Sequence, residues 1–172
     1  MPSSRFLISS NVLTTTTASV SFTSIPSTYT DLVIKMSLRS NDTTTGGSGW
    51  FRINSLSTNI YSETELRGNG ATASSTRQSA TSIAYFNYFV GGNATTANTF
   101  SSTEIYLPSY LASQNKPWSV LNGMENNATT AYISAQAGLI QSTAAISSIA
   151  FFCDSGNWVS GSSFYLYGLR SS

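Results

Sequence analysis

The sequence predicts an all-β protein: an antiparallel β-sandwich of about ten strands, with little or no helix. Short apolar or alternating runs recur between clusters of turn residues along the whole chain. No window shows the 3.6-residue apolar period of an amphipathic helix with its caps. Ser and Thr together make up 55 of the 172 residues. Because Thr favours strands and Ser favours turns, this composition also points to many short strands.

Each expected strand is a run of apolar or alternating residues that ends at a turn or proline signal. In chain order the first five are residues 18–22, 32–38, 50–53, 59–66 and 83–90, and the last five are residues 99–107, 118–124, 131–139, 146–152 and 162–169. The polar residues 41–49, 71–80 and 91–98 are expected to be long loops, which favours a jelly-roll-like sandwich over a meander. Residues 139–146 are expected to contain a short helical turn.

The chain is expected to form one sandwich domain over residues 18–172. Residues 1–17 precede it as either an N-terminal arm or an edge strand. Their apolar tip consists of Phe6, Leu7 and Ile8 beside Arg5. As an arm this tip can dock on a neighbouring protein, so these four residues are candidates for contact with a partner.

Composition excludes several classes of function. Charged residues make up only 9% of the chain and there is no His, so a Ser-His-Asp or Cys-His relay and a His-bearing metal site are ruled out. The single cysteine, Cys153, excludes an intramolecular disulfide and is expected to be a buried, inert thiol. A net charge of +1 provides no strong positive potential for binding the phosphates of a nucleic acid. No apolar run is long enough for a membrane helix. We therefore expect no cofactor, no nucleic acid and no membrane partner.

Two acidic residues share one face of an expected strand. Glu63 and Glu65 are two positions apart, and paired carboxylates can serve a glycoside hydrolase, with Glu104 as a further candidate acid. The alternative is a solvated strand face on which the acids pair with Arg67. The second interpretation is the simpler one, so we expect no enzyme.

An aromatic run stands out in the strand at 83–90. Tyr85 and Phe89 are expected to point to one face, and Phe86 and Tyr88 to the other. A strand that is apolar on both faces has both faces covered. The cover can be a loop of the same chain or a second subunit, and Tyr and Phe are enriched in subunit interfaces. A third possibility is carbohydrate binding by exposed aromatic side chains, including the three tryptophans Trp50, Trp118 and Trp158.

Several motifs give the chain a family resemblance from about residue 18 to 169. They are SIPSTYTDLV at 24–33, NIYS at 59–62, LRGNG at 66–70, Phe100 followed by EIYLPSY at 104–110, ENN at 125–127 and SFYLYGL at 163–169. In this order and spacing the chain resembles small structural proteins of tailed bacteriophages, especially phages of cyanobacteria and marine bacteria. The resemblance implies a virion component with a jelly-roll or related β-sandwich fold that is often trimeric.

The size of the chain favours one place on the virion. The sequence shows no heptads or shaft repeats of the kind found in tail fibres. A capsid decoration (cement) protein is therefore the leading hypothesis. It would bind the major capsid protein on the outer surface of the shell as a homotrimer. Tyr85, Phe86, Tyr88 and Phe89 would pack its subunits, and the tip at residues 5–8 would contact the shell. The alternative is a tail-fibre module that binds a host surface glycan.

Overall fold

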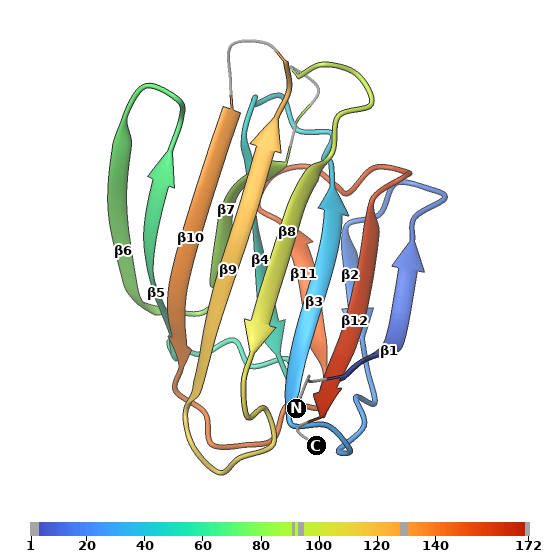
Figure 1. The fold of residues 1–172 in the computed structure, drawn as a ribbon, viewed down its shortest axis with the longest axis vertical. Coiled ribbons are helices and arrows are strands. Elements are labelled where there is room, and N and C mark those ends of the chain that lie inside the picture. Colours follow the sequence, from blue (N-terminus) through green and yellow to red (C-terminus); the bar gives the residue numbers. More distant parts are fainter. Residues whose placement is uncertain (1–3, 91, 93–94, 128–130, 171–172) are drawn as a thin grey trace.

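The structure is a computed structural model that describes residues 4–90, 92, 95–127 and 131–170, without the side chains of 88–90. In these residues the chain forms twelve β-strands and no helix (Figure 1). The strands are β1 (Ser4–Val12), β2 (Ser19–Phe22), β3 (Asp31–Leu38), β4 (Gly47–Ile53), β5 (Tyr61–Gly68), β6 (Ala73–Thr81), β7 (Ala84–Val90), β8 (Ser101–Leu107), β9 (Lys116–Glu125), β10 (Ala131–Ile140), β11 (Ile149–Cys153) and β12 (Ser163–Arg170).

The strands form two sheets of unequal width. The large sheet has eight strands in the order β1-β12-β3-β8-β9-β10-β5-β6, and the small sheet has four in the order β2-β11-β4-β7. Every neighbouring pair is antiparallel. The two sheets lie face to face, with the large sheet in front in Figure 1. The predicted all-β antiparallel sandwich is therefore confirmed, while the finer jelly-roll assignment stays a prediction.

All ten expected strands are present, and two more appear. β1 shows that residues 4–12 are an edge strand of the sandwich, hydrogen-bonded to β12, and not a free arm. The prediction of a long loop at 71–80 was wrong, because β6 pairs with β5 there. The side chains of β6 are small or polar and almost all exposed, so the strand carries no apolar pattern. The expected helical turn at 139–146 was also wrong, since residues 139 and 140 complete β10.

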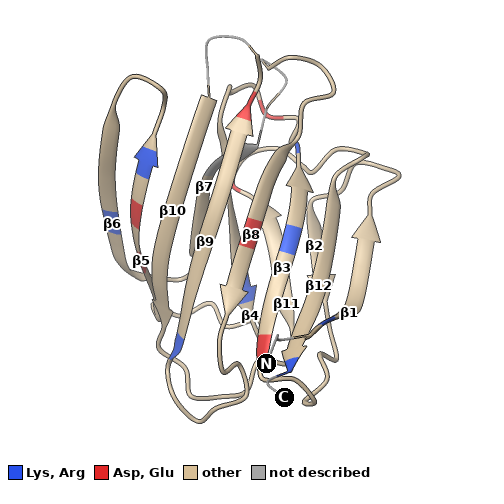
Figure 2. Ribbon diagram, in the orientation of Figure 1, with Lys and Arg blue, Asp and Glu red and all other residues tan. Residues whose placement is uncertain are grey.

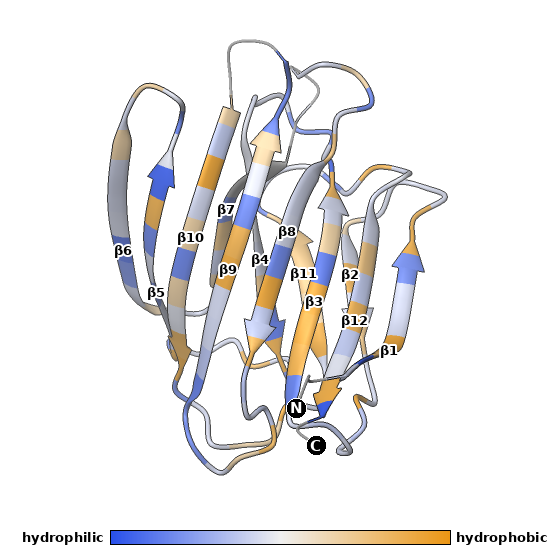
Figure 3. Ribbon diagram, viewed as in Figure 1, coloured by the Kyte–Doolittle hydropathy of each residue, from blue (hydrophilic) through white to orange (hydrophobic). Residues whose placement is uncertain are grey.

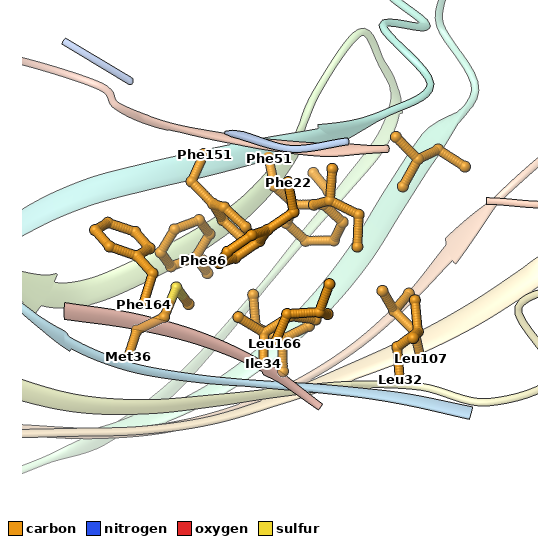
Figure 4. Close-up of a cluster of buried hydrophobic side chains, with 14 of the residues drawn as sticks. Phe22, Leu32, Ile34, Met36, Phe51, Phe86, Leu107, Phe151, Phe164 and Leu166 are labelled. Atoms are coloured by element: carbon orange, nitrogen blue, oxygen red, sulfur yellow. The ribbon is translucent and has the colours of Figure 1, made fainter. Parts of the chain in front are cut away.

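The core between the sheets is aromatic on the side of the small sheet and mostly aliphatic on the side of β3. Phe51, Phe86 and Phe151 are fully buried, and their ring centroids lie 6.1–6.4 Å apart (Figure 4). Facing them, Ile34 and Leu166 come from neighbouring strands of the large sheet. Strand alternation explains the arrangement, because every second side chain of an antiparallel strand points into the sandwich.

The small sheet covers only the middle of the large one. β7, at one edge of the small sheet, lies over β9 and β10 and reaches β5. β6 extends beyond it, and eight of its nine side chains are exposed. At the opposite edge, β1 is exposed along nearly its whole length. The large sheet therefore overhangs the small sheet at both edges.

Candidate functional site

The aromatic residues of β7 do not form one surface. Phe86 is fully buried in the core of the chain, where it contacts the rings of Phe51 and Phe151. It has no surface to offer a second subunit, so its assignment to a subunit interface is corrected. Tyr85 points to the opposite face and is half-buried. The side chains of Tyr88 and Phe89 lie outside the described residues.

The residues predicted to contact a shell lie on β1. Phe6 and Leu7 are exposed, whereas Ile8 packs against the core. The guanidinium of Arg5 lies 3.6 Å from a carboxylate oxygen of Glu104. Two of the four residues therefore offer apolar surface at the open edge of the large sheet.

The three tryptophans lie in two environments. Trp118 and Trp158 are buried in the core. Trp50 lies on the outer face of the small sheet, where Phe152 stacks on it with centroids 4.0 Å apart and planes tilted by 16°. The guanidinium carbon of Arg52 lies 4.8 Å from the centre of the Trp50 ring. The indole of Trp50 thus already has an aromatic and a cationic neighbour within the chain.

An exposed apolar patch, which we define as Leu66, Leu121 and Ile133, lies on the outer face of the large sheet. These side chains are 61%, 62% and 62% exposed. Leu66 on β5 and Leu121 on β9 are the cross-strand partners of Ala135 on β10, so the three form one row across the sheet. Ile133 also lies on β10, two residues before Ala135, and points to the same face. Figure 3 shows the apolar bands on these neighbouring strands.

Shallow grooves border the apolar patch on both sides of Ile133. One of about 350 Å³ is lined by Leu121, Ile133 and Glu104 among others. The next, of about 470 Å³, continues from Ile133 to Phe100 and Tyr132. Contiguous apolar surface of this kind marks sites of protein–protein contact. The sequence analysis did not single out this patch, because the sequence alone does not show which strands become neighbours in the sheet.

The acidic residues do not converge on an accessible catalytic centre. Glu63 and Glu65 are buried between the sheets, 4% and 2% exposed, so a solvated strand face is also the wrong interpretation for them. Glu104 lies on the outer face, where its carboxylate is 3.1 Å from the ammonium of Lys35 (Figure 2). Arg67 donates a hydrogen bond from Nε to the hydroxyl of Ser74. The side chains of Glu63 and Glu65 are therefore largely shielded from solvent.

The interior location changes the ionisation of Glu63. Burial, together with the nearby charge of Glu65, raises the pKa of the Glu63 carboxyl to about 7. Burial also raises the pKa of Tyr85, with smaller effects from Asp154 and from Glu63. The neighbourhood of β5 and β7 therefore disfavours negative charge.

Cys153 lies at the end of β11 and is half-buried. Burial raises the pKa of its thiol strongly, and the negative charges of Asp42 and Asp154 add to this effect. Because the thiolate is the reactive form, this raised pKa favours the unreactive thiol. The sequence analysis expected a buried thiol, whereas the side chain is half-buried.

Comparison with known protein families, curated proteins and solved structures found no match to this chain. In the part of the chain that the structure describes, no helix is long and apolar enough to span a membrane.

Proposed function

We propose that this chain is a structural protein of a bacteriophage virion, a capsid decoration protein that binds the assembled shell as a homotrimer. The sequence resemblance supports this function, and so does a surface with few charges. The observation that carries the proposal is the apolar patch. Three aliphatic side chains lie side by side on a sheet face, each more than 60% exposed. Such a patch is suited to burial against another protein.

We assign the subunit interface to the apolar patch in place of Phe86. A stable interface typically covers about 800 Å² on each partner, which requires a broad surface and not one strand. The outer face of the large sheet offers that breadth, with Leu66, Leu121 and Ile133 on β5, β9 and β10 towards its β6 edge. Phe6 and Leu7, at the far edge of the same sheet, remain our candidates for contact with the major capsid protein.

The mechanism is mass action. A protein that binds only the assembled shell stabilises it by RT ln(1 + [L]/Kd) at each site. Three linked subunits add avidity, since the second and third contacts form at a high effective concentration. This mechanism requires no catalytic step.

Two measurements test this function. Quantitative mass spectrometry of virions should give hundreds of copies of the chain, in simple ratio to the major capsid protein. A dozen or two copies would place the chain on the tail and favour the glycan-binding alternative.

The second measurement tests the subunit interface. Light scattering coupled to gel filtration gives the mass of the purified protein in solution. Leu121→Asp should dissociate the trimer. Ser21→Asp is the control and should not, because Ser21 is exposed on β2, in the small sheet and away from the apolar patch. A trimer that survives Leu121→Asp would contradict the interface assignment.

A further inference from the structure

Three buried polar side chains meet on the inner face of β5 and β10. Glu65 and Gln136 are direct cross-strand partners. Glu63 is two residues before Glu65, so it points to the same side of the sheet. The three side chains are only 4%, 2% and 4% exposed for Glu63, Glu65 and Gln136 respectively. Two acids and an amide thus share one interior location, here called the inner polar cluster.

Most polar atoms of the inner polar cluster lack a hydrogen-bond partner among the described residues. These atoms are both carboxylate oxygens of Glu63, Oε1 of Glu65, and both Oε1 and Nε2 of Gln136. Oε2 of Glu65 accepts long hydrogen bonds of 3.4 Å from the amide of Asn87 and from the hydroxyl of Thr76. Buried polar groups are nearly always paired, and an uncompensated interior charge is strongly unfavourable. The cluster therefore calls for a positively charged or donor-rich occupant.

We propose that the inner polar cluster binds a hard divalent cation, and that the cation is Ca²⁺. Its ligands are the carboxylates of Glu63 and Glu65 and the amide oxygen of Gln136. Two carboxylates match the charge of a divalent ion, and oxygen ligands suit Ca²⁺, whereas zinc and copper ions favour nitrogen and sulfur ligands. Ca²⁺ also accepts a flexible set of six to eight oxygens, so water can complete its coordination.

The unpartnered amide distinguishes this cluster from an ordinary pair of acids. Among the described residues no group of three or more His, Cys, Asp and Glu side chains is arranged for a metal ion. The proposed site has two carboxylates and depends on Gln136 for its third protein ligand. A shared proton joins only two oxygens, whereas one cation binds oxygens of both acids and of Gln136 together.

The inner polar cluster lies close to the edge of the large sheet. Thr76 and Gln78 of β6 lie opposite Glu65 and Glu63 in the register, and both are exposed. The small sheet ends at β7, so β6 carries no covering strand. The site is thus one strand away from solvent.

Trp118 provides a spectroscopic probe at the site. Gly138 is the direct partner of both Glu63 and Trp118. The indole lies over Gly138, because a Cβ there would be 2.0 Å from its Cε2 atom. Trp118 is therefore close enough to sensitise the luminescence of Tb³⁺, an ion that takes the place of Ca²⁺ in oxygen sites.

The experiment is a Tb³⁺ titration of the full chain with excitation of tryptophan, followed by displacement with Ca²⁺. Sensitised emission that Ca²⁺ removes, and a Tm that rises with Ca²⁺, are the expected results. Glu65→Gln and Gln136→Met should each weaken Tb³⁺ binding by about 10-fold or more, since even the loss of a supporting residue has that effect. Glu125→Gln, at an exposed acid on β9, is the matched control and should bind as the wild type does.

The proposal fails if the wild type shows neither sensitised emission nor a rise of Tm in Ca²⁺. It also fails if Glu65→Gln and Glu125→Gln bind Tb³⁺ equally well, because the ion would then sit elsewhere. Folding does not confuse this result, since Glu65→Gln keeps the side-chain shape and removes an interior charge. Trp118→Phe should abolish the emission and keep the rise of Tm in Ca²⁺.

Discussion

Replacing Glu63 by Gln should stabilise the protein at high pH when divalent cations are removed. The unfolded chain releases the Glu63 proton near the ordinary pKa of 4.5, whereas the folded chain holds it up to a pKa of about 7. Between these two values the folded state binds more protons than the unfolded state, so the free energy of unfolding falls as the pH rises. The contribution of this proton is complete below pH 4.5 and is lost above pH 7.

The magnitude follows from the same two values. One pKa unit corresponds to about 1.36 kcal/mol, so the loss amounts to about 3 kcal/mol at pH 8. Gln has the same shape and does not titrate. The difference in unfolding free energy between Glu63→Gln and the wild type should therefore grow from near zero at pH 4.5 to about 3 kcal/mol at pH 8. Titrating groups remote from Glu63 affect both proteins alike and cancel in this difference.

The assay is urea denaturation followed by tryptophan fluorescence, in a chelator, at several pH values between 4.5 and 8. Equal m-values would show that both proteins unfold from equally compact states. Glu125→Gln, whose carboxyl is exposed, should follow the wild-type profile. Parallel profiles for the wild type and Glu63→Gln would refute the reasoning, because the buried carboxyl would then not be the group that retains a proton.

Three further predictions concern packing and reactivity. Phe86→Ala should lower the free energy of unfolding by about 3–5 kcal/mol, since it empties a fully buried aromatic site, and a loss below 1 kcal/mol in urea denaturation would contradict that role. Gly138→Ala should cost about 1–3 kcal/mol in the same assay, because the new methyl group meets Trp118, and an unchanged midpoint would show that the indole moves freely. Cys153 should react slowly with a disulfide reagent at pH 8 in the native protein and quickly in denaturant; similar rates in both states would mean that the thiol is accessible.

The fold class follows from the sequence because apolar alternation and turn residues mark most strands. β6 could not be predicted in this way, because a strand that is exposed on both faces needs no apolar residues. It is recognised only by its hydrogen bonds to β5. Phe86 was wrongly assigned to a subunit interface. Alternation along a strand separates its two faces, but it does not show which face packs against the core of the same chain.

The phase of β5 explains two features that sequence reasoning did not foresee. Tyr61 is fully buried, and its position forces Glu63 and Glu65 to the same inner face. Leu66 is consequently turned outward into the apolar patch. A shift by one residue would reverse every side chain of the strand. Hydropathy alone favours that reversed phase, so neither the inner polar cluster nor the patch was visible before the register was known.

The position of β12 has a consequence for folding kinetics. This strand lies between β1 and β3, so the most C-terminal strand of the sheet completes the pairing of two of the most N-terminal ones. Until it arrives, β1 has no hydrogen-bonded neighbour in the large sheet. The entropy cost of closing such long loops must be met before the strand contacts form. Folding is therefore slow, in the range of milliseconds to seconds for all-β domains. During that interval one edge of β3 is unpaired. Chains that lack residues 163–170 keep this edge unpaired, so we expect them to aggregate or to be bound by chaperones.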